Sequence, residues 1–211
     1  MDLIEAMQSN GTCREYKSDP VPTAVMTRVL DAARFAPSGG NRQPVRYIVV
    51  TDAALKQQLK DWYLPHWNAY IEATKQGDIA LNAVPRLVQK ADYFANHLEQ
   101  VPALIVVCAR LSDCHATDTE LGRLSVVGGA SIYPGVQNLL LAARKEGLGT
   151  ALTTLLCIEE LKVKKLLNIP DDIATAATVA IGYPLHPFPK KLSRRRLEGS
   201  AFANRYGEAL T

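Results

Sequence analysis

Apolar residues recur every three or four positions in two stretches near the start of the chain. Residues 2–9 and 22–35 both show this spacing, the second through Val25, Val29 and Leu30 among others. Such a repeat places the apolar side chains on one face of a helix. The pattern therefore predicts two amphipathic helices before residue 36.

Four short runs rich in β-branched residues predict strands. They are RYIVVT at 46–51, ALIVVCAR at 103–110, TALTTL at 150–155 and ATAATVAIGYP at 174–184. The first two are separated by a mostly helical insertion at about 53–98. Because none of the runs is long, each is expected to be a buried strand of a small sheet.

Two more helices are predicted in the second half of the chain. One covers residues 125–146 and ends at Gly147, a residue suited to a left-handed cap, and the other covers 158–168. Pro134 falls inside the longer one and is expected to kink or break it near Ala130. The apolar stretch that this helix contains is interrupted by polar residues, which favours a buried helix over a membrane span.

The alternation of helices and short strands is irregular and shows no internal repeat. This indicates an α/β or α+β fold, with a small sheet wrapped by helices. The chain has 211 residues, of which 47% are hydrophobic, enough for one sizeable core. We therefore expect one domain over residues 1–211, with 53–98 as a variable insertion.

Composition excludes several function classes. The net charge of +3 is small, and only KKLSRRR at 190–196 is densely basic, so a nucleic-acid partner is not expected. The four cysteines form no CxxC pair and the four histidines are scattered, so neither a metal site nor a redox pair is predicted. The first ten residues do not resemble a signal peptide, so the expected location is cytoplasmic and no membrane partner is expected.

Familiar catalytic and nucleotide-binding motifs do not fit. A P-loop needs a Gly-Lys dipeptide, and the chain has none. The GLGT segment at 147–150 follows a helix and opens a strand, the reverse of the order in a dinucleotide-binding loop. No GxSxG elbow occurs either.

Four separated segments, taken in order, carry a resemblance. They are NGTCREY at 10–16, AARFAPSGGNRQPVRYIVV at 32–50, VQNLLLAARKEGLGTAL at 136–152 and LSRRRLE at 192–198. Together they resemble the FMN-dependent nitroreductase family. That resemblance implies an α+β fold with a small, mostly antiparallel central sheet wrapped by helices. It also implies an interlocked homodimer that holds FMN at the subunit interface.

The first of these segments stands where family members usually carry Arg-x-Ser-x-Arg. Here Gly11, Thr12 and Arg14 are the positions that the resemblance assigns to FMN, while Asn10 replaces the first arginine. A threonine hydroxyl and a permanent guanidinium are suited to a phosphate or to the carbonyl edge of a flavin. The alternative is that Arg14 pairs with a surface acid.

The loop APSGGNRQP, at 36–44, is implied to reach across the dimer to the flavin of the other subunit. The positions carried over are Pro37, Ser38, Gly39 and Asn41, and Gly40 is expected beside the substrate. Small residues let a backbone approach a flat ring closely. The alternative is an ordinary turn between a helix and a strand.

Two further segments complete the implied cofactor site. Leu152, Thr153 and Thr154 correspond to the family's segment beside the flavin ring, although a plain buried strand explains them equally well. Arg194 and Arg196 alternate in an extended stretch and so project to the same side. The family's equivalent basic pair grips the FMN phosphate, whereas the alternative is a solvated basic tail.

The insertion contains an aromatic group that could form a lid over the flavin and contact substrate. Its members are Tyr63, His66, Trp67 and Tyr70. Aromatic residues at helical spacing are also typical of core packing. His66 could donate a proton, but a lone histidine is more often structural.

The resemblance implies an oxidoreductase that uses NADH or NADPH to reduce a small planar acceptor, such as a nitroaromatic or a quinone, by a ping-pong mechanism. FMN supplies this chemistry, so no protein nucleophile is expected. Related branches suggest flavin cleavage or reductive dehalogenation instead. A flavin-binding protein without turnover is the alternative outside the enzymes.

Overall fold

A computed structural model describes residues 1–76 and 85–210, so part of the predicted insertion, 77–84, lies outside the described residues. The helices are α1 (Leu3–Ser9), α2 (Thr23–Ala33), α3 (Ala53–Gln76), α4 (Pro85–Asn96), α5 (Tyr133–Lys145) and α6 (Glu160–Leu167). The strands are β1 (Val45–Val50), β2 (Ala103–Arg110), β3 (Gly149–Thr153) and β4 (Ile173–Gly182). All four predicted strands are present, each within three residues of its expected ends.

The strands form one antiparallel sheet in the order β1-β2-β4-β3. Strand β2 is central and buried almost throughout, and its side chains alternate between two cores. Leu104, Val106 and Cys108 belong to one core, while Ile105 and Val107 belong to the other. The chain therefore has an α+β fold with an antiparallel sheet, which confirms the prediction of the fold class.

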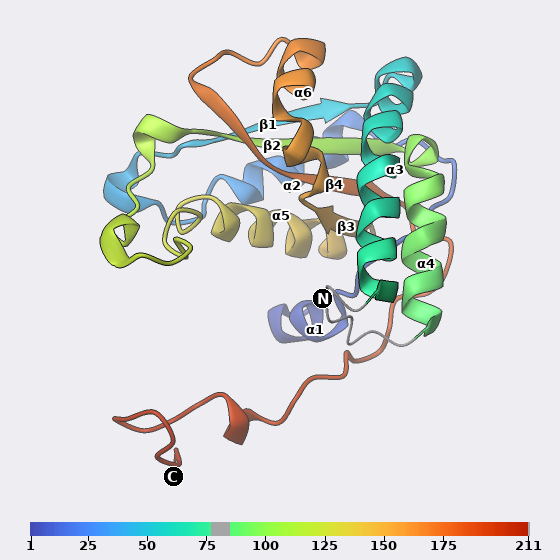
Figure 1. The fold of residues 1–211 in the computed structure, drawn as a ribbon. Helices are drawn as coiled ribbons and strands as arrows, with labels where there is room; N and C mark the ends of the chain where they lie inside the picture. Colours follow the sequence, from blue (N-terminus) through green and yellow to red (C-terminus); the bar gives the residue numbers. More distant parts are fainter. Residues whose placement is uncertain (77–84, 211) are drawn as a thin grey trace.

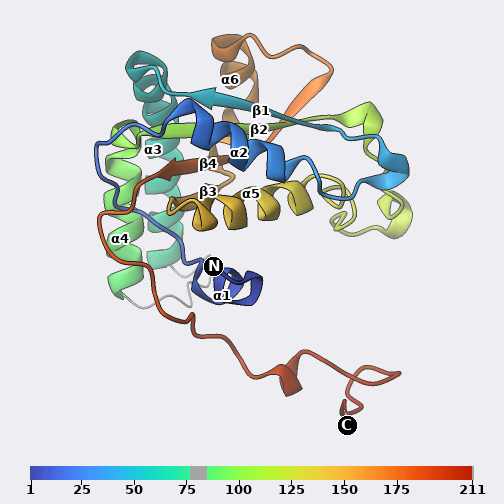
Figure 2. The same cartoon turned by 180° about the vertical axis from the view of Figure 1, so that it is seen from behind.

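Helices cover both faces of the sheet (Figures 1 and 2). Helices α2 and α5 pack together over one face, with Val29 and Leu139 fully buried there. Helices α3, α4 and α6 cover the other face, where Leu59 of α3 and Val163 of α6 are buried. In the described residues, no helix is both long and apolar enough to cross a bilayer.

The aromatic residues of the insertion contribute to this second core. Tyr63 is 4% exposed and Trp67 8% exposed, and both pack with Phe94 of α4 on the sheet. Trp67 also donates from Nε1 to Asp92 Oδ1 at 2.9 Å. Tyr63 and Trp67 therefore pack in the core, as the alternative interpretation expected. Each ring also borders a cavity that is described below.

The helix predicted over residues 125–146 is absent in its first third, and it breaks close to Ala130, where Pro134 was expected to break it. Helix α5 begins at Tyr133, and Pro134 lies in its first turn, where a missing N–H costs nothing. Residues 125–132 form turns that are organised by Asp118, which is 4% exposed. The Asp118 carboxylate accepts from Ser125 Oγ at 2.6 Å and Val126 N at 2.9 Å. These hydrogen bonds lower the Asp118 pKa to about 2.

The segment before α2 runs along the free edge of β3. Thr12 bridges to Thr150, and Cys13 N donates to Thr150 O at 2.8 Å. This approach requires glycine at position 149, because a Cβ there would lie 2.5 Å from Cys13 Cβ. The pairing fixes Thr12 and Arg14 beside the end of β3.

We expect Gly149→Ala to destabilise the protein by about 1–3 kcal/mol, the usual cost of overpacking. The added methyl group would push residues 12–14 away from β3. Gly199→Ala is the matched control, because a Cβ at position 199 meets nothing within 4 Å. Urea unfolding of both variants measures the difference, and equal midpoints would show that the approach of Cys13 is not tight.

Candidate functional site

A large cavity of about 670 Å³ lies between the segment at 10–15, helices α3 and α4, and the C-terminal segment at 184–194. Its wall combines apolar and cationic side chains. Trp67, Tyr70 and Leu87 line it from the helices, while Arg14 and Arg194 line it from the two segments. Beyond this cavity the C-terminal segment runs away from the body of the protein (Figures 1 and 2).

A second cavity of about 250 Å³ adjoins the first and shares Thr12, Arg14, Trp67 and Tyr70 with it. Strand β3 contributes Leu152 and Thr153. The Leu152 side chain is 43% exposed although both neighbouring strand positions are more enclosed. An exposed leucine beside a polar edge is a suitable surface for a flat, partly polar ring.

Tyr63 lines this second cavity and is in contact with Thr153 of β3. Thr153 Oγ1 donates to the Tyr63 hydroxyl at 3.4 Å. Burial raises the pKa of Tyr63, so its hydroxyl keeps its proton at neutral pH. The tyrosine therefore presents an O–H group and not a negative charge.

Glu15 joins three parts of the large cavity's wall. Its Oε1 accepts from Lys90 Nζ of α4 at 3.0 Å, and its Oε2 lies 3.1 Å from His186 Nε2. The Glu15 backbone carbonyl also accepts from Leu185 N at 2.9 Å. The hydrogen bond from Lys90 is the main reason that the Glu15 pKa is lowered.

The loop at 37–43 lies elsewhere, at the far end of β1, and lines a separate cavity of about 240 Å³ through Gly39 and Gly40. Gly40, Asn41 and Gln43 have left-handed φ values of 58°, 53° and 50°. For the two residues other than glycine this conformation is costly. It is held because Ser38 Oγ accepts from Gln43 N at 3.0 Å.

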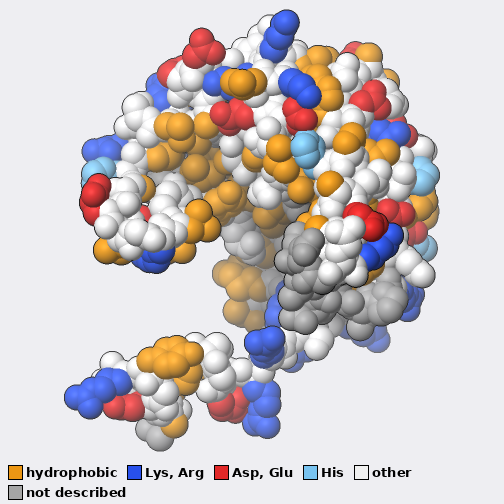
Figure 3. Space-filling model, in the orientation of Figure 1, with side chains coloured by type: hydrophobic (Ala, Val, Ile, Leu, Met, Phe, Trp, Pro, Cys, Tyr) orange, Lys and Arg blue, Asp and Glu red, His pale blue; other side chains and the backbone are white. Residues whose placement is uncertain are grey.

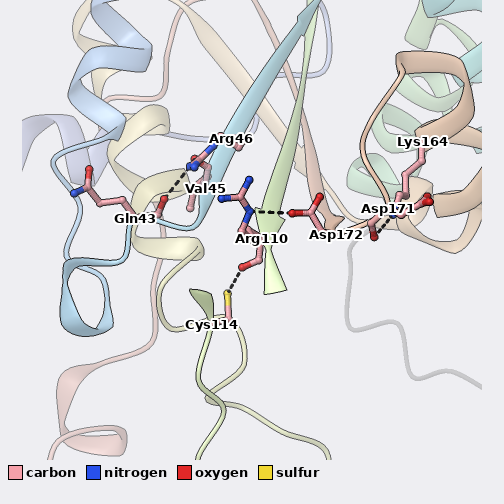
Figure 4. A network of polar contacts seen from close by, with 8 residues as sticks. All are labelled: Gln43, Val45, Arg46, Arg110, Cys114, Lys164, Asp171 and Asp172. Atoms are coloured by element: carbon pink, nitrogen blue, oxygen red, sulfur yellow. Dashed lines mark hydrogen bonds and ion pairs between the residues drawn. The ribbon is translucent and has the colours of Figure 1, made fainter. Parts of the chain in front are cut away.

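Arg46 fastens the base of this loop (Figure 4). Arg46 Nη1 donates to Gln43 O at 2.9 Å and to Val45 O at 2.8 Å. Next to it, Arg110 Nε donates to Asp172 Oδ2 at 3.0 Å. The loop is therefore exposed but well braced, and Gly39 N also donates to Ser131 Oγ at 3.0 Å, which ties its tip to the segment before α5.

The structure brings together part of the predicted site. The predicted residues that line the two adjoining cavities are Gly11, Thr12, Arg14, Tyr63, Trp67, Tyr70, Leu152, Thr153 and Arg194. Pro37, Ser38, Gly39, Gly40 and Asn41 belong to the distant loop and line neither of the two. Within one chain, the loop and Arg14 do not meet.

Three further predicted residues also lie outside the two cavities. Thr154 is exposed at the end of β3, and Arg196 pairs with Glu198 at 3.1 Å in the C-terminal segment. His66 Nε2 lies 2.8 Å from Glu159 Oε1, so it joins α3 to the turn that precedes α6. Neither cavity contains His66, and its structural alternative fits this contact.

Sequence reasoning missed Lys90, Glu15 and His186. No spacing rule identifies them, because each is an ordinary charged residue in its own segment. Only the packing of α4 against the segments at 10–15 and 184–194 gathers them. Within the described residues, no group of three or more potential metal ligands was found.

Comparison with known proteins gives the family of this fold. The model of the nitroreductase family matches residues 10–183. The chain belongs to the nitroreductase family. It is 31% identical to 5,6-dimethylbenzimidazole synthase of Rhodospirillum rubrum, over 84% of this chain and 80% of that protein. It is 26% identical to a protein of Thermus thermophilus named NADH dehydrogenase, over 87% of each chain.

A solved structure of another family member shows the same architecture. The crystal structure of oxidised iodotyrosine deiodinase bound to FMN and 3-iodo-L-tyrosine superimposes with a TM-score of 0.71 and 26% identity. The match covers 98% of this chain and 99% of that one. The family and the four-stranded antiparallel sheet with its helices are thereby established.

The residues of this nitroreductase-family chain are chemically suited to FMN. The second cavity has an apolar floor at Leu152 and hydrogen-bonding groups at Thr12 and Arg14, which suit a flavin ring. The large cavity adds the cation Arg194, which suits a phosphate. The two cavities adjoin through shared residues, so one elongated molecule can contact both.

Proposed function

We propose that this protein is a homodimeric, FMN-dependent oxidoreductase that uses NADH or NADPH to reduce a small planar acceptor. The observation that carries the proposal is the joined pair of cavities, apolar at Leu152 and cationic at Arg194. Membership of the nitroreductase family supports it. So does the FMN of the solved relative, and the Thermus protein's name supports a nicotinamide donor.

The separation of the predicted site supports the homodimer. The loop at 37–41 and Arg14 belong to different cavities of one chain. A strained, braced loop that projects into solvent is suited to completing another molecule's site. The surface is also hollowed beside the projecting loops around residue 120, with hydrophobic side chains along the upper wall of the hollow (Figure 3). A second copy would bring loop and cavity together.

In this proposal each residue has a limited task. Bound FMN supplies the hydride and electron transfer, as the cofactor does throughout flavin chemistry. Thr12 and Arg14 would hold the polar edge of the ring, and Arg14 would offset negative charge there. Leu152 and Trp67 would exclude water from the ring, and Arg194 and Arg196 would bind the phosphate. The acceptor would be a small planar molecule such as a nitroaromatic or a quinone.

Steady-state kinetics tests this function directly. The protein should be yellow with bound FMN, and it should oxidise NADH or NADPH when a quinone is present. Because the donor and the acceptor would use the same open side of the flavin in turn, double-reciprocal plots at several quinone concentrations should be parallel. Intersecting lines would contradict the shared pocket. Bound FMN without turnover of any quinone or nitroaromatic would indicate a binding protein.

A further inference from the structure

The large cavity has a cationic group that neither the family resemblance nor the proposed function uses. Lys90 of α4 lines it together with Asn10, Gly11 and Arg194. Position 10 is where the family usually provides an arginine, and the asparagine here carries no charge. A dianionic phosphate at this end of the cavity would therefore lack one of its usual cationic partners.

The Lys90 ammonium has capacity for a further ligand. Among the described residues its hydrogen-bond partner is Glu15 Oε1, at 3.0 Å. An ammonium group has three N–H donors, so two remain. The Lys90 side chain is 38% exposed, which means that the remaining donors are accessible from the cavity.

The charges around Lys90 favour an anion. The cavity wall carries the cations Arg14, Lys90 and Arg194 and one carboxylate, Glu15. That carboxylate is shared, since its second oxygen lies 3.1 Å from His186 Nε2. Glu15 therefore fixes Lys90 in place while leaving net positive charge on the wall, and a doubly charged ligand offsets that excess.

We infer that Lys90 binds the phosphate of FMN and supplies, from α4, the positive charge that Asn10 does not. This inference rests on the proposed function, because it requires FMN in these cavities. It assigns the phosphate end to the side of the large cavity that Lys90 shares with Arg194. It also gives the insertion a binding role of its own, distinct from its packing on the sheet.

The test compares FMN with riboflavin, which has the same ring and no phosphate. Apoprotein is titrated with each flavin, and quenching of flavin fluorescence gives the two dissociation constants. Lys90→Met should weaken FMN by about tenfold to a hundredfold, the range for one charge-assisted contact, and leave riboflavin within about twofold. Lys90→Arg should retain most of the preference for FMN.

Two controls separate phosphate binding from a structural role. Arg86→Met removes an exposed cation from the same helix, outside the cavity wall, and should change neither constant. Glu15→Gln breaks the ion pair but keeps the Lys90 ammonium, so the preference for FMN should persist. If Lys90 only held Glu15, then Glu15→Gln would reproduce the loss seen with Lys90→Met, which would overturn the inference.

Further outcomes of the titrations distinguish failure of the Lys90 inference from failure of the proposed function. Equal weakening of FMN and riboflavin by Lys90→Met, or no change in either, would overturn the inference and leave the proposed function intact. If the wild-type protein bound neither flavin, the proposed function itself would fail, and this inference with it. Weaker salt dependence of FMN binding in Lys90→Met than in wild type would support the inference, because the contact is ionic.

Discussion

A heterodimer of one Arg14→Glu chain and one Gly39→Trp chain is expected to bind FMN and turn over, although each parent homodimer does neither. In each parent, both sites are damaged. In the heterodimer, one site collects both substitutions, while the other combines an intact Arg14 with an intact Gly39. Twofold symmetry therefore restores up to half of the sites.

Position 39 is chosen on structural grounds. A Cβ there would meet only Ser131 Oγ, at 3.7 Å, an ordinary contact, and Gly39 has no left-handed φ, so the backbone accepts a side chain. Asn41 is less suitable because its φ of 53° penalises a bulky side chain. The two chains are co-expressed with different tags and the doubly tagged dimer is purified. Normal dimerisation with no FMN in that species would mean that the loop is only a turn.

The second large effect concerns the C-terminal arginines. Replacing Arg194 and Arg196 with alanine should weaken FMN by about two orders of magnitude or more, since two charge-assisted contacts would be lost. Riboflavin should bind nearly as before. Arg195→Ala is the matched control, because alternate residues of an extended segment face opposite sides. The structure further ranks the pair: Arg194 lines the large cavity, whereas Arg196 is 90% exposed and pairs with Glu198.

The affinities are measured as for Lys90, with apoprotein and both flavins. Equal losses for FMN and riboflavin would show that the arginines stabilise the segment and do not recognise phosphate. A loss in the Arg195→Ala control as large as that in the double variant would show that total charge matters, not its placement.

The four strands were predicted well from local sequence. Strand β2 is buried on both faces, so it appears in the sequence as a continuous apolar, β-branched run. The helices were harder. The apolar run that begins near Ser125 and Val126 predicted a helix, but Asp118 binds both residues and holds them in turns. The contact spans seven or eight residues, and periodicity does not reveal such a contact.

The candidate site, too, was predicted from the sequence only in part. Arg14 and Thr153 were predicted from motifs and do line adjoining cavities. Lys90 was not predicted, because its position depends on how α4 packs against distant segments. His66 was assigned to substrate on its neighbours' aromatic character, but its contact with Glu159 turns it toward α6. Sequence motifs indicate residues that share a segment, whereas tertiary packing decides which segments share a cavity.

The glycine at position 11 has a consequence for how this chain can change by mutation. A Cβ at position 11 would lie 3.2 Å from both Leu192 and Pro189, which belong to the segment that carries Arg194. Leu192 N also donates to Gln8 O at 2.7 Å, so this segment is docked beside position 11. A long side chain here would require the segment to move and take Arg194 with it. The effects of substitutions at positions 11 and 192 are therefore expected to be non-additive.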